Sequence, residues 1–293
     1  MRESFLKYLQ FEKRYSPHTL TSYENDLTGF ERFIDQHFPG TTLADATHAV
    51  IRNWIVSLVD EGLSPDSVNR KIACLRSFYK FLLRREMIER DPMQKIRVLK
   101  TARKLPQFLS EAEMARLLDH VTFEKGFAGC RDRLILELLY GTGTRLNEII
   151  ELKSTDIDLP SRTLKVLGKR NKERVVPFAV SLKKVIGDYL NEKNSAGLKN
   201  DQGYLIVTDQ GKKCYPMLIY RTVRKYLDLF TTVEKRSPHV LRHTFATHLL
   251  NKGAELNAVK DLLGHTSLAA TQVYTHNSIE KLKAVFDQAH PKA

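Results

Sequence analysis

The sequence predicts a mainly α-helical protein of two domains, the second of which also holds a small β-sheet. Three observations lead to this fold class. The chain has 293 residues, which is long for one compact domain and natural for two. Apolar residues recur at helical spacing along most of it. The β-branched segments T-L-K-V-L and R-V-V-P-F flank the polar stretch G-K-R-N-K-E, a pattern typical of a β-hairpin.

Residues 1–98 are expected to form an all-helical first domain. Ser16-Pro17 and Ser64-Pro65 are typical helix starts, and after each of them apolar residues repeat along one helix face. A linker is expected at residues 99–108, because the stretch I-R-V-L-K-T-A-R-K-L-P-Q-F is basic and has no periodicity.

The second domain is expected to span residues 109–293. It starts at S-E-A-E, which resembles a capping box. The buried helix R-D-R-L-I-L-E-L-L-Y follows and should stop at G-T-G. After the hairpin, the pattern predicts helices over residues 180–194, 216–230, 238–251, 255–263 and 267–275, and then an amphipathic tail.

The bulk composition indicates a polyanionic partner. The net charge is +13 and the isoelectric point is about 9.6, with most of the surplus after residue 100. Three scattered cysteines argue against a disulfide framework or a zinc finger. The charged N-terminus is unlike a signal peptide, and no apolar run approaches the ~20 residues that span a bilayer. We therefore expect a soluble, cytoplasmic protein.

One face of the helix that begins at Ser64 is basic and small enough to approach a DNA groove, although an ordinary solvated face is an equal alternative. Its residues are Arg70, Lys71, Cys74 and Ser77.

Two arginines near predicted helix starts could clamp one phosphate. In S-P-H-V-L-R, the Ser-Pro pair starts a helix, so His239 and Arg242 project from one face of its first turns, where an anion is favoured. Arg145 follows G-T-G-T and should begin another helix, with Glu148 three residues later. Guanidiniums can hold the non-bridging oxygens of a phosphate bidentately.

Other side chains offer proton transfer and a nucleophile. Lys169 lies at the hairpin turn and could protonate a leaving oxygen, although an ordinary surface lysine is a strong alternative there. His239 and His265 can move or donate protons. Tyr274, nine residues after His265, could attack a phosphodiester covalently. A metal site at His239, His243 and His265 is not expected, since Arg242 would repel the cation and the intervening turn lacks a carboxylate.

Together these motifs resemble those of the tyrosine recombinases, the family of the integrases and the Xer-type site-specific recombinases. G-T-G-T-R-L-N-E-I-I-E-L carries Arg145, and G-K-R-N-K-E-R-V-V-P carries Lys169. S-P-H-V-L-R-H-T-F-A-T-H-L-L carries His239 and Arg242, and residues 263–276 carry His265 and Tyr274. The chain departs from the family pattern at Arg170, where glycine is usual, and at Asn147, where serine is usual. The role of Lys169 could therefore be shared with Lys172.

The resemblance implies a helical, SAM-like core-binding domain followed by a catalytic domain. It implies that Tyr274 attacks the scissile phosphate to give a 3′-phosphotyrosine, that a Holliday junction follows, and that neither metal, ATP nor another cofactor is needed. The implied partners are double-stranded DNA with paired sites, further subunits in a homo- or hetero-tetramer, a possible second recombinase and an accessory DNA motor. DNA contacts are expected at Arg70, Lys71, Ser77, Lys104, Arg170 and Lys172.

The implied biological role is chromosome dimer resolution. An integrase of a mobile element, a DNA-relaxing topoisomerase and a non-catalytic architectural DNA-binding protein are the alternatives. The apolar stripe of the tail, formed by Ile279, Leu282, Val285 and Phe286, must be buried somewhere. The resemblance favours a neighbouring protomer over the tail's own domain.

Overall fold

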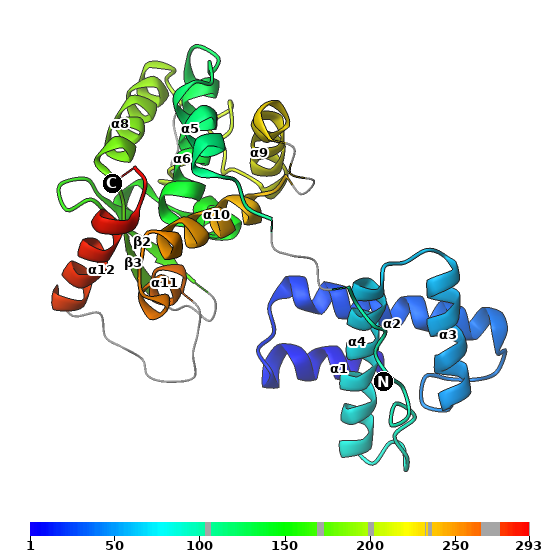
Figure 1. Cartoon of the computed structure of the whole chain (residues 1–293). Coiled ribbons are helices and arrows are strands. Elements are labelled where there is room, and N and C mark those ends of the chain that lie inside the picture. Colours follow the sequence, from blue (N-terminus) through cyan, green and yellow to red (C-terminus); the bar gives the residue numbers. More distant parts are fainter. Residues whose placement is uncertain are drawn as a thin grey trace. The chain divides into compact units, whose positions relative to one another are not determined.

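The chain folds into two units, which Figure 1 shows, and each has its own hydrophobic core. The computed structural model describes residues 1–102, 107–168, 173–198, 202–231, 233, 236–264 and 276–292. Its two compact units are Met1–Lys104 and Leu105–Ala293, so the division falls inside the expected linker. The described chain is mainly helical with one small sheet, which confirms the predicted fold class.

The first unit is all-helical. Its elements are α1 (Arg2–Lys7), the π-helix Tyr8–Glu12, α2 (Pro17–His37), α3 (His48–Asp60) and α4 (Pro65–Arg84). The side chains of Ser16 and Ser64 accept hydrogen bonds from backbone N–H groups three residues on, which confirms both predicted helix starts. The core of this unit includes Phe30, Trp54 and Phe78.

The second unit combines helices with a three-stranded sheet. Its helices are α5 (Glu111–Asp119), α6 (Phe127–Thr142), α7 (Leu146–Glu151), α8 (Val180–Ser195), α9 (Pro216–Phe230), α10 (Pro238–Asn251), α11 (Leu256–Leu263) and α12 (His276–Ala289). The strands β1 (Ile157–Asp158), β2 (Thr163–Leu167) and β3 (Glu173–Pro177) are antiparallel in that order.

The predicted helices over residues 180–194, 216–230, 238–251 and 255–263 are confirmed within two residues as α8 to α11, whereas the helix expected over residues 267–275 lies outside the described residues. The predicted hairpin is β2–β3, with Leu164 opposite Val176. The capping box at Ser110 and Glu113 is present. The sequence missed β1, whose two residues are too few for a pattern. Ser237 occupies the N-cap position of α10, which confirms the predicted helix start, although its side chain makes no cap hydrogen bond there.

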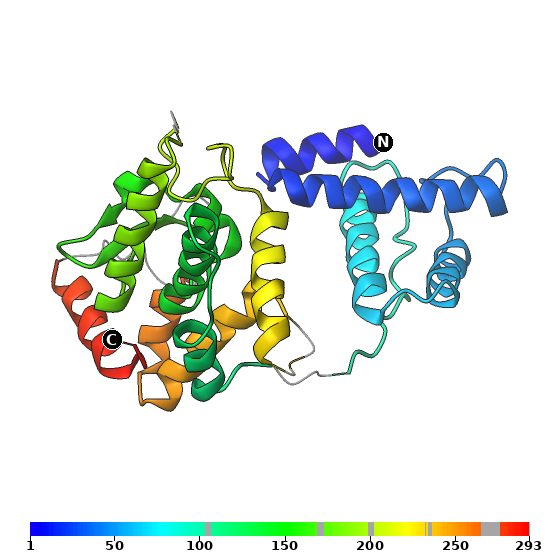
Figure 2. The same cartoon turned by 90° about the horizontal axis from the view of Figure 1, so that it is seen from above.

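Helix α6 is the centre of the second unit. Nearly every side chain from Leu134 to Thr142 is buried, because α8 and α10 pack against it from different sides (Figure 2). A helix that carries apolar side chains on all of its sides must be enclosed in this way. Its C-terminal end therefore holds a fixed position, and the residues that follow it form part of the site described below.

The tail helix α12 packs on its own domain, against α10, α11 and β3. Leu282 and Phe286 are buried in the core of the second unit, and the ring of His290 stacks on Phe286 at 4.7 Å between centroids. Arg162 donates two hydrogen bonds to the carboxylate of Asp287 at 3.2 and 2.9 Å. In this single chain the stripe completes the core around Phe245, whereas docking on a neighbouring protomer stays a prediction. Ile279 lies among the residues whose side chains the structure does not describe.

No helix in the described ranges is both long enough and apolar enough to cross a lipid bilayer.

The buried imidazole of His290 should make the second unit sensitive to acid. Burial lowers the pKa of His290 to about 4, whereas an exposed histidine titrates near ~6.5. As the pH falls from about 6.5 to about 4, His290 becomes protonated in the unfolded chain but stays neutral in the folded chain. The free energy of unfolding therefore falls with pH across that window, by up to about 3 kcal/mol from this one group.

We predict that His290→Phe, which keeps a ring against Phe286, flattens this acid dependence. Thermal unfolding would be followed by far-UV circular dichroism at about pH 7.5 and about pH 5. The single tryptophan, Trp54, lies in the first unit, so its fluorescence separates the two units. The exposed His120 supplies the control His120→Gln. An unchanged pH dependence in His290→Phe would show that this imidazole is hydrated in the folded protein.

Candidate active site

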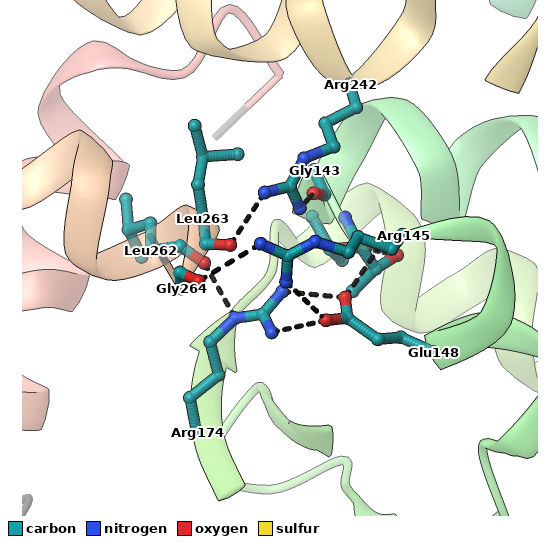
Figure 3. A network of polar contacts seen from close by, with 10 residues as sticks. Gly143, Arg145, Glu148, Arg174, Arg242, Leu262, Leu263 and Gly264 are labelled. Atoms are coloured by element: carbon teal, nitrogen blue, oxygen red, sulfur yellow. Dashed lines mark hydrogen bonds and ion pairs between the residues drawn. The ribbon is translucent and has the colours of Figure 1, made fainter. Parts of the chain in front are cut away.

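Three arginines of the second unit belong to one polar network, in which Arg145 and Arg174 contact the buried carboxylate of Glu148 and Arg242 contacts backbone carbonyls, as Figure 3 shows. The side chains come from the start of α7, from β3 and from α10. The backbone carbonyls at the ends of α6 and α11 complete the network.

Arg145 occupies the N-cap position of α7, as predicted. Its backbone N–H donates to Glu148 Oε2 at 2.7 Å, and its Nη1 donates to Glu148 Oε1 at 2.7 Å. Its Nη2 donates to the carbonyl of Gly264 at 3.0 Å. The side chain is 24% exposed, so the guanidinium is held from within and remains accessible to a ligand.

Arg242 lies in α10 and is 9% exposed. Its Nη1 donates to the carbonyl of Gly143, and its Nη2 donates to that of Leu263 at 2.7 Å. Burial, and after it the charge of Arg145, lowers the pKa of Arg242 to about 10. Since a guanidinium carries five N–H donors, both arginines keep donors that these contacts do not use. An anion between them would offset the repulsion of the two charges.

Two glycines bring backbone carbonyls to these arginines. Gly143 and Gly264 end α6 and α11 with φ of +59° and +63°, a conformation that favours glycine. A Cβ at Gly143 would overlap the ring of Phe245, and one at Gly264 would lie 3.0 Å from the side chain of Arg174. The glycines of the G-T-G-T-R and L-G-H motifs are thus required by both backbone geometry and space.

Arg174 is the member of the network that the sequence reasoning missed. It lies in β3, is 4% exposed, and donates to both oxygens of Glu148 at 2.7 and 2.8 Å. Its Nε donates to the carbonyl of Leu262 at 2.9 Å. A signal was present in the sequence, because Arg174 shares a strand face with the buried Val176, and a charge on a core face needs a partner.

Glu148 is ionised at neutral pH although it is buried. Burial by itself raises the pKa of this carboxyl, but the hydrogen bonds and charge of Arg174, followed by the bonds from Arg145, outweigh it and hold the pKa below its usual value. Two guanidiniums therefore hold this carboxylate, and the charge of a third, Arg242, adds to a positive surplus. Such a surplus, with donors to spare, suits a phosphate group.

The structure brings two of the six predicted catalytic residues together, Arg145 and Arg242. His239 is exposed in the first turn of α10, one turn before Arg242. Lys169, His265 and Tyr274 lie outside the described residues. The carbonyl of Gly264, the residue before His265, accepts a hydrogen bond from Arg145.

The predicted DNA-contact face on α4 is partly different from expectation. Arg70 and Lys71 both pair with Asp26, a buried residue of α2 that the sequence reasoning did not single out. Arg70 keeps 49% of its side chain exposed, and Ser77 is half-buried. Cys74 is buried and faces the backbone of Tyr23, so its place on an accessible face was wrong. Lys104, Arg170 and Lys172 lie outside the described residues.

Comparison with known proteins gives family matches over both units. Residues 107–281 match the phage integrase family, and residues 3–86 match the SAM-like N-terminal domain of phage integrases. The tyrosine recombinase XerC of Chlorobaculum tepidum is 37% identical over 314 residues, which cover 99% of this chain and 94% of that protein. XerC of Staphylococcus carnosus is 40% identical, with 100% of this chain and 98% of that protein covered.

Solved structures agree with this assignment. The crystal structure of XerA recombinase is 28% identical, with a TM-score of 0.51 over 100% of this chain and 99% of that one. XerH recombinase bound to a palindromic difH substrate is 23% identical, with a TM-score of 0.74 over 97% of this chain and 83% of that one, a likeness of fold. The chain therefore belongs to the phage integrase family and is a tyrosine recombinase of the Xer type, an enzyme that cuts and rejoins DNA at specific sites.

Proposed function

We propose that Arg145 and Arg242 hold the scissile phosphate of a DNA strand while Tyr274 attacks its phosphorus. The observation that carries this assignment is the convergence of two guanidiniums from α7 and α10, both fixed by carbonyls and both with unused donors. Preorganised donors stabilise the charge that develops in the transition state, since they need no rearrangement as the reaction proceeds. The phosphate also compensates the positive surplus around Glu148.

The chemical step exchanges one phosphodiester for another. The bond from phosphorus to the Tyr274 oxygen forms, and the bond to the 5′-oxygen breaks, which leaves a 3′-phosphotyrosine. Lys169 protonates the departing 5′-oxygen, and His239 assists removal of the tyrosine proton. His265 donates a hydrogen bond to the phosphate. A 5′-hydroxyl from the partner strand then attacks the phosphotyrosine and releases Tyr274, so the overall exchange requires neither ATP nor metal.

We further propose that two molecules hold each site on double-stranded DNA and that two sites meet in a tetramer, through a Holliday junction. Residues 1–98 and the basic linker at 99–108 would grip the DNA together with the catalytic domain 109–293. Chromosome dimer resolution, with a second recombinase and a DNA motor, is the role that fits an Xer-type enzyme. The three cysteines are free thiols, and burial raises their pKa values, which suits the reducing cytoplasm.

Tyr274→Phe should bind DNA normally and form no covalent protein–DNA adduct, because only the nucleophilic oxygen is removed. The measurement is a denaturing gel after incubation with a nicked suicide substrate. Tyr215→Phe, at an exposed tyrosine of the same domain, is the control and should form the adduct. An adduct that persists in Tyr274→Phe would assign the nucleophile to another residue.

Arg145→Lys and Arg242→Lys should each slow cleavage by ~10²–10³ while DNA binding changes much less, since charge is kept and bidentate geometry is lost. Single-turnover cleavage and equilibrium binding would be measured side by side. Arg224→Lys, at an exposed arginine of α9, controls for a general loss of guanidinium. Parallel losses of binding and cleavage would make the two arginines simple DNA anchors.

EDTA should leave wild-type cleavage unchanged, because the proposed clamp consists of protein donors alone. The rate of adduct formation would be measured with the chelator and again after Mg²⁺ is restored. A loss of cleavage that returns with the metal would refute the proposed mechanism.

A further inference from the structure

Arg174 contacts both parts of the site that hold the arginine pair. On one side it clamps the carboxylate of Glu148, which binds Arg145. On the other it fixes the carbonyl of Leu262 at the end of α11. The next two carbonyls, of Leu263 and Gly264, accept hydrogen bonds from Arg242 and Arg145.

Through these two contacts Arg174 can influence the positions of both Arg145 and Arg242. Arg145 contacts both oxygens of Glu148, through its backbone N–H and its Nη1, but it lies on the same short helix as this carboxylate. Arg174 adds a two-pronged contact from a different element, the strand β3, and the buried setting makes each charged hydrogen bond strong. The position of Arg145 then depends on a side chain that need not touch the DNA.

We propose that Arg174 is a positioning residue for phosphate transfer, which acts through Glu148 on Arg145 and through the end of α11 on Arg242. This inference rests on the proposed function of the two arginines. A residue that only stabilised the fold would alter the amount of folded protein, whereas Arg174 alters the geometry of the clamp within the folded protein.

The first test compares Arg174→Lys with Lys165→Met in the full-length chain. Lys165 pairs with Glu173 across the same hairpin, but this ion pair is exposed and does not reach Glu148. Single-turnover cleavage should fall by ~10²-fold in Arg174→Lys, since small displacements of catalytic groups have effects of that size. DNA affinity should change little, and Lys165→Met should cleave like wild type. Arg174→Met repeats the test without the lysine charge if Arg174→Lys fails to fold by circular dichroism.

A change of substrate separates positioning from stability. A methylphosphonate at the scissile position removes the charge of one non-bridging oxygen, so the reaction depends less on the arginine clamp. The ratio of wild-type to Arg174→Lys cleavage rates should therefore shrink on this substrate, as it should for Arg145→Lys. A ratio that is identical on both substrates would overturn the proposal.

A double-mutant cycle tests the route through Glu148. If Arg174 acts through this carboxylate, Arg174→Lys should slow cleavage less in a Glu148→Gln background than in wild type. Additive effects on the rate would show that Arg174 works independently of Glu148 and would contradict the inference.

A spectroscopic readout is independent of recombination. The Nε–H resonances of Arg145 and Arg242, assigned by their loss in the lysine variants, should shift in Arg174→Lys and stay unchanged in Lys165→Met. If wild type formed no adduct, the proposed function would fail, but these resonances would still decide the role of Arg174. Unshifted resonances in folded Arg174→Lys would overturn the positioning role.

Discussion

The buried carboxylate of Glu148 is the interaction on which the arginine site depends. Arg145 and Arg174 both donate to it, and the charge of Glu148 offsets part of the lowering of the Arg242 pKa that burial and the charge of Arg145 cause. Without the carboxylate, three guanidiniums would repel one another in a poorly hydrated space, and without the arginines, the carboxylate would be an uncompensated buried charge. The charges nevertheless do not cancel, because three arginines face one glutamate. Such a surplus of positive charge favours the binding of an anion.

Backbone carbonyls also hold the guanidiniums of Arg145 and Arg242 in place. The ends of α6 and α11 converge on the arginines, and each ends in a glycine with positive φ. Carbonyl oxygens orient a guanidinium without neutralising its charge, so these contacts fix direction and preserve electrostatic strength. The packing of α6 between α8 and α10 therefore helps to orient Arg242, since it determines where the carbonyl of Gly143 lies.

The tail helix is connected to this site through the core. Phe286 of α12 and Phe245 of α10 belong to the same apolar cluster, and Phe245 also fills the space that a side chain at Gly143 would need. The far end of the tail is held by Lys292, which donates to Asp119 and to the buried Glu137. Protonation of His290 or displacement of the tail helix would therefore disturb the packing around α10, the helix that carries Arg242.

The sequence by itself determined the helical class, the hairpin, and the helix starts at Ser16, Ser64 and Arg145, because each depends on residues within a few positions of one another. It also identified Arg242 through its family motif. Only the tertiary structure decided that Arg174 holds Glu148 and that Asp26 holds Arg70 and Lys71, because those partners are 26 and more than 40 residues apart in the chain. It likewise placed the tail stripe on its own domain. An apolar pattern shows that a face must be buried, but the surface that covers it is set by the shape of the assembled core.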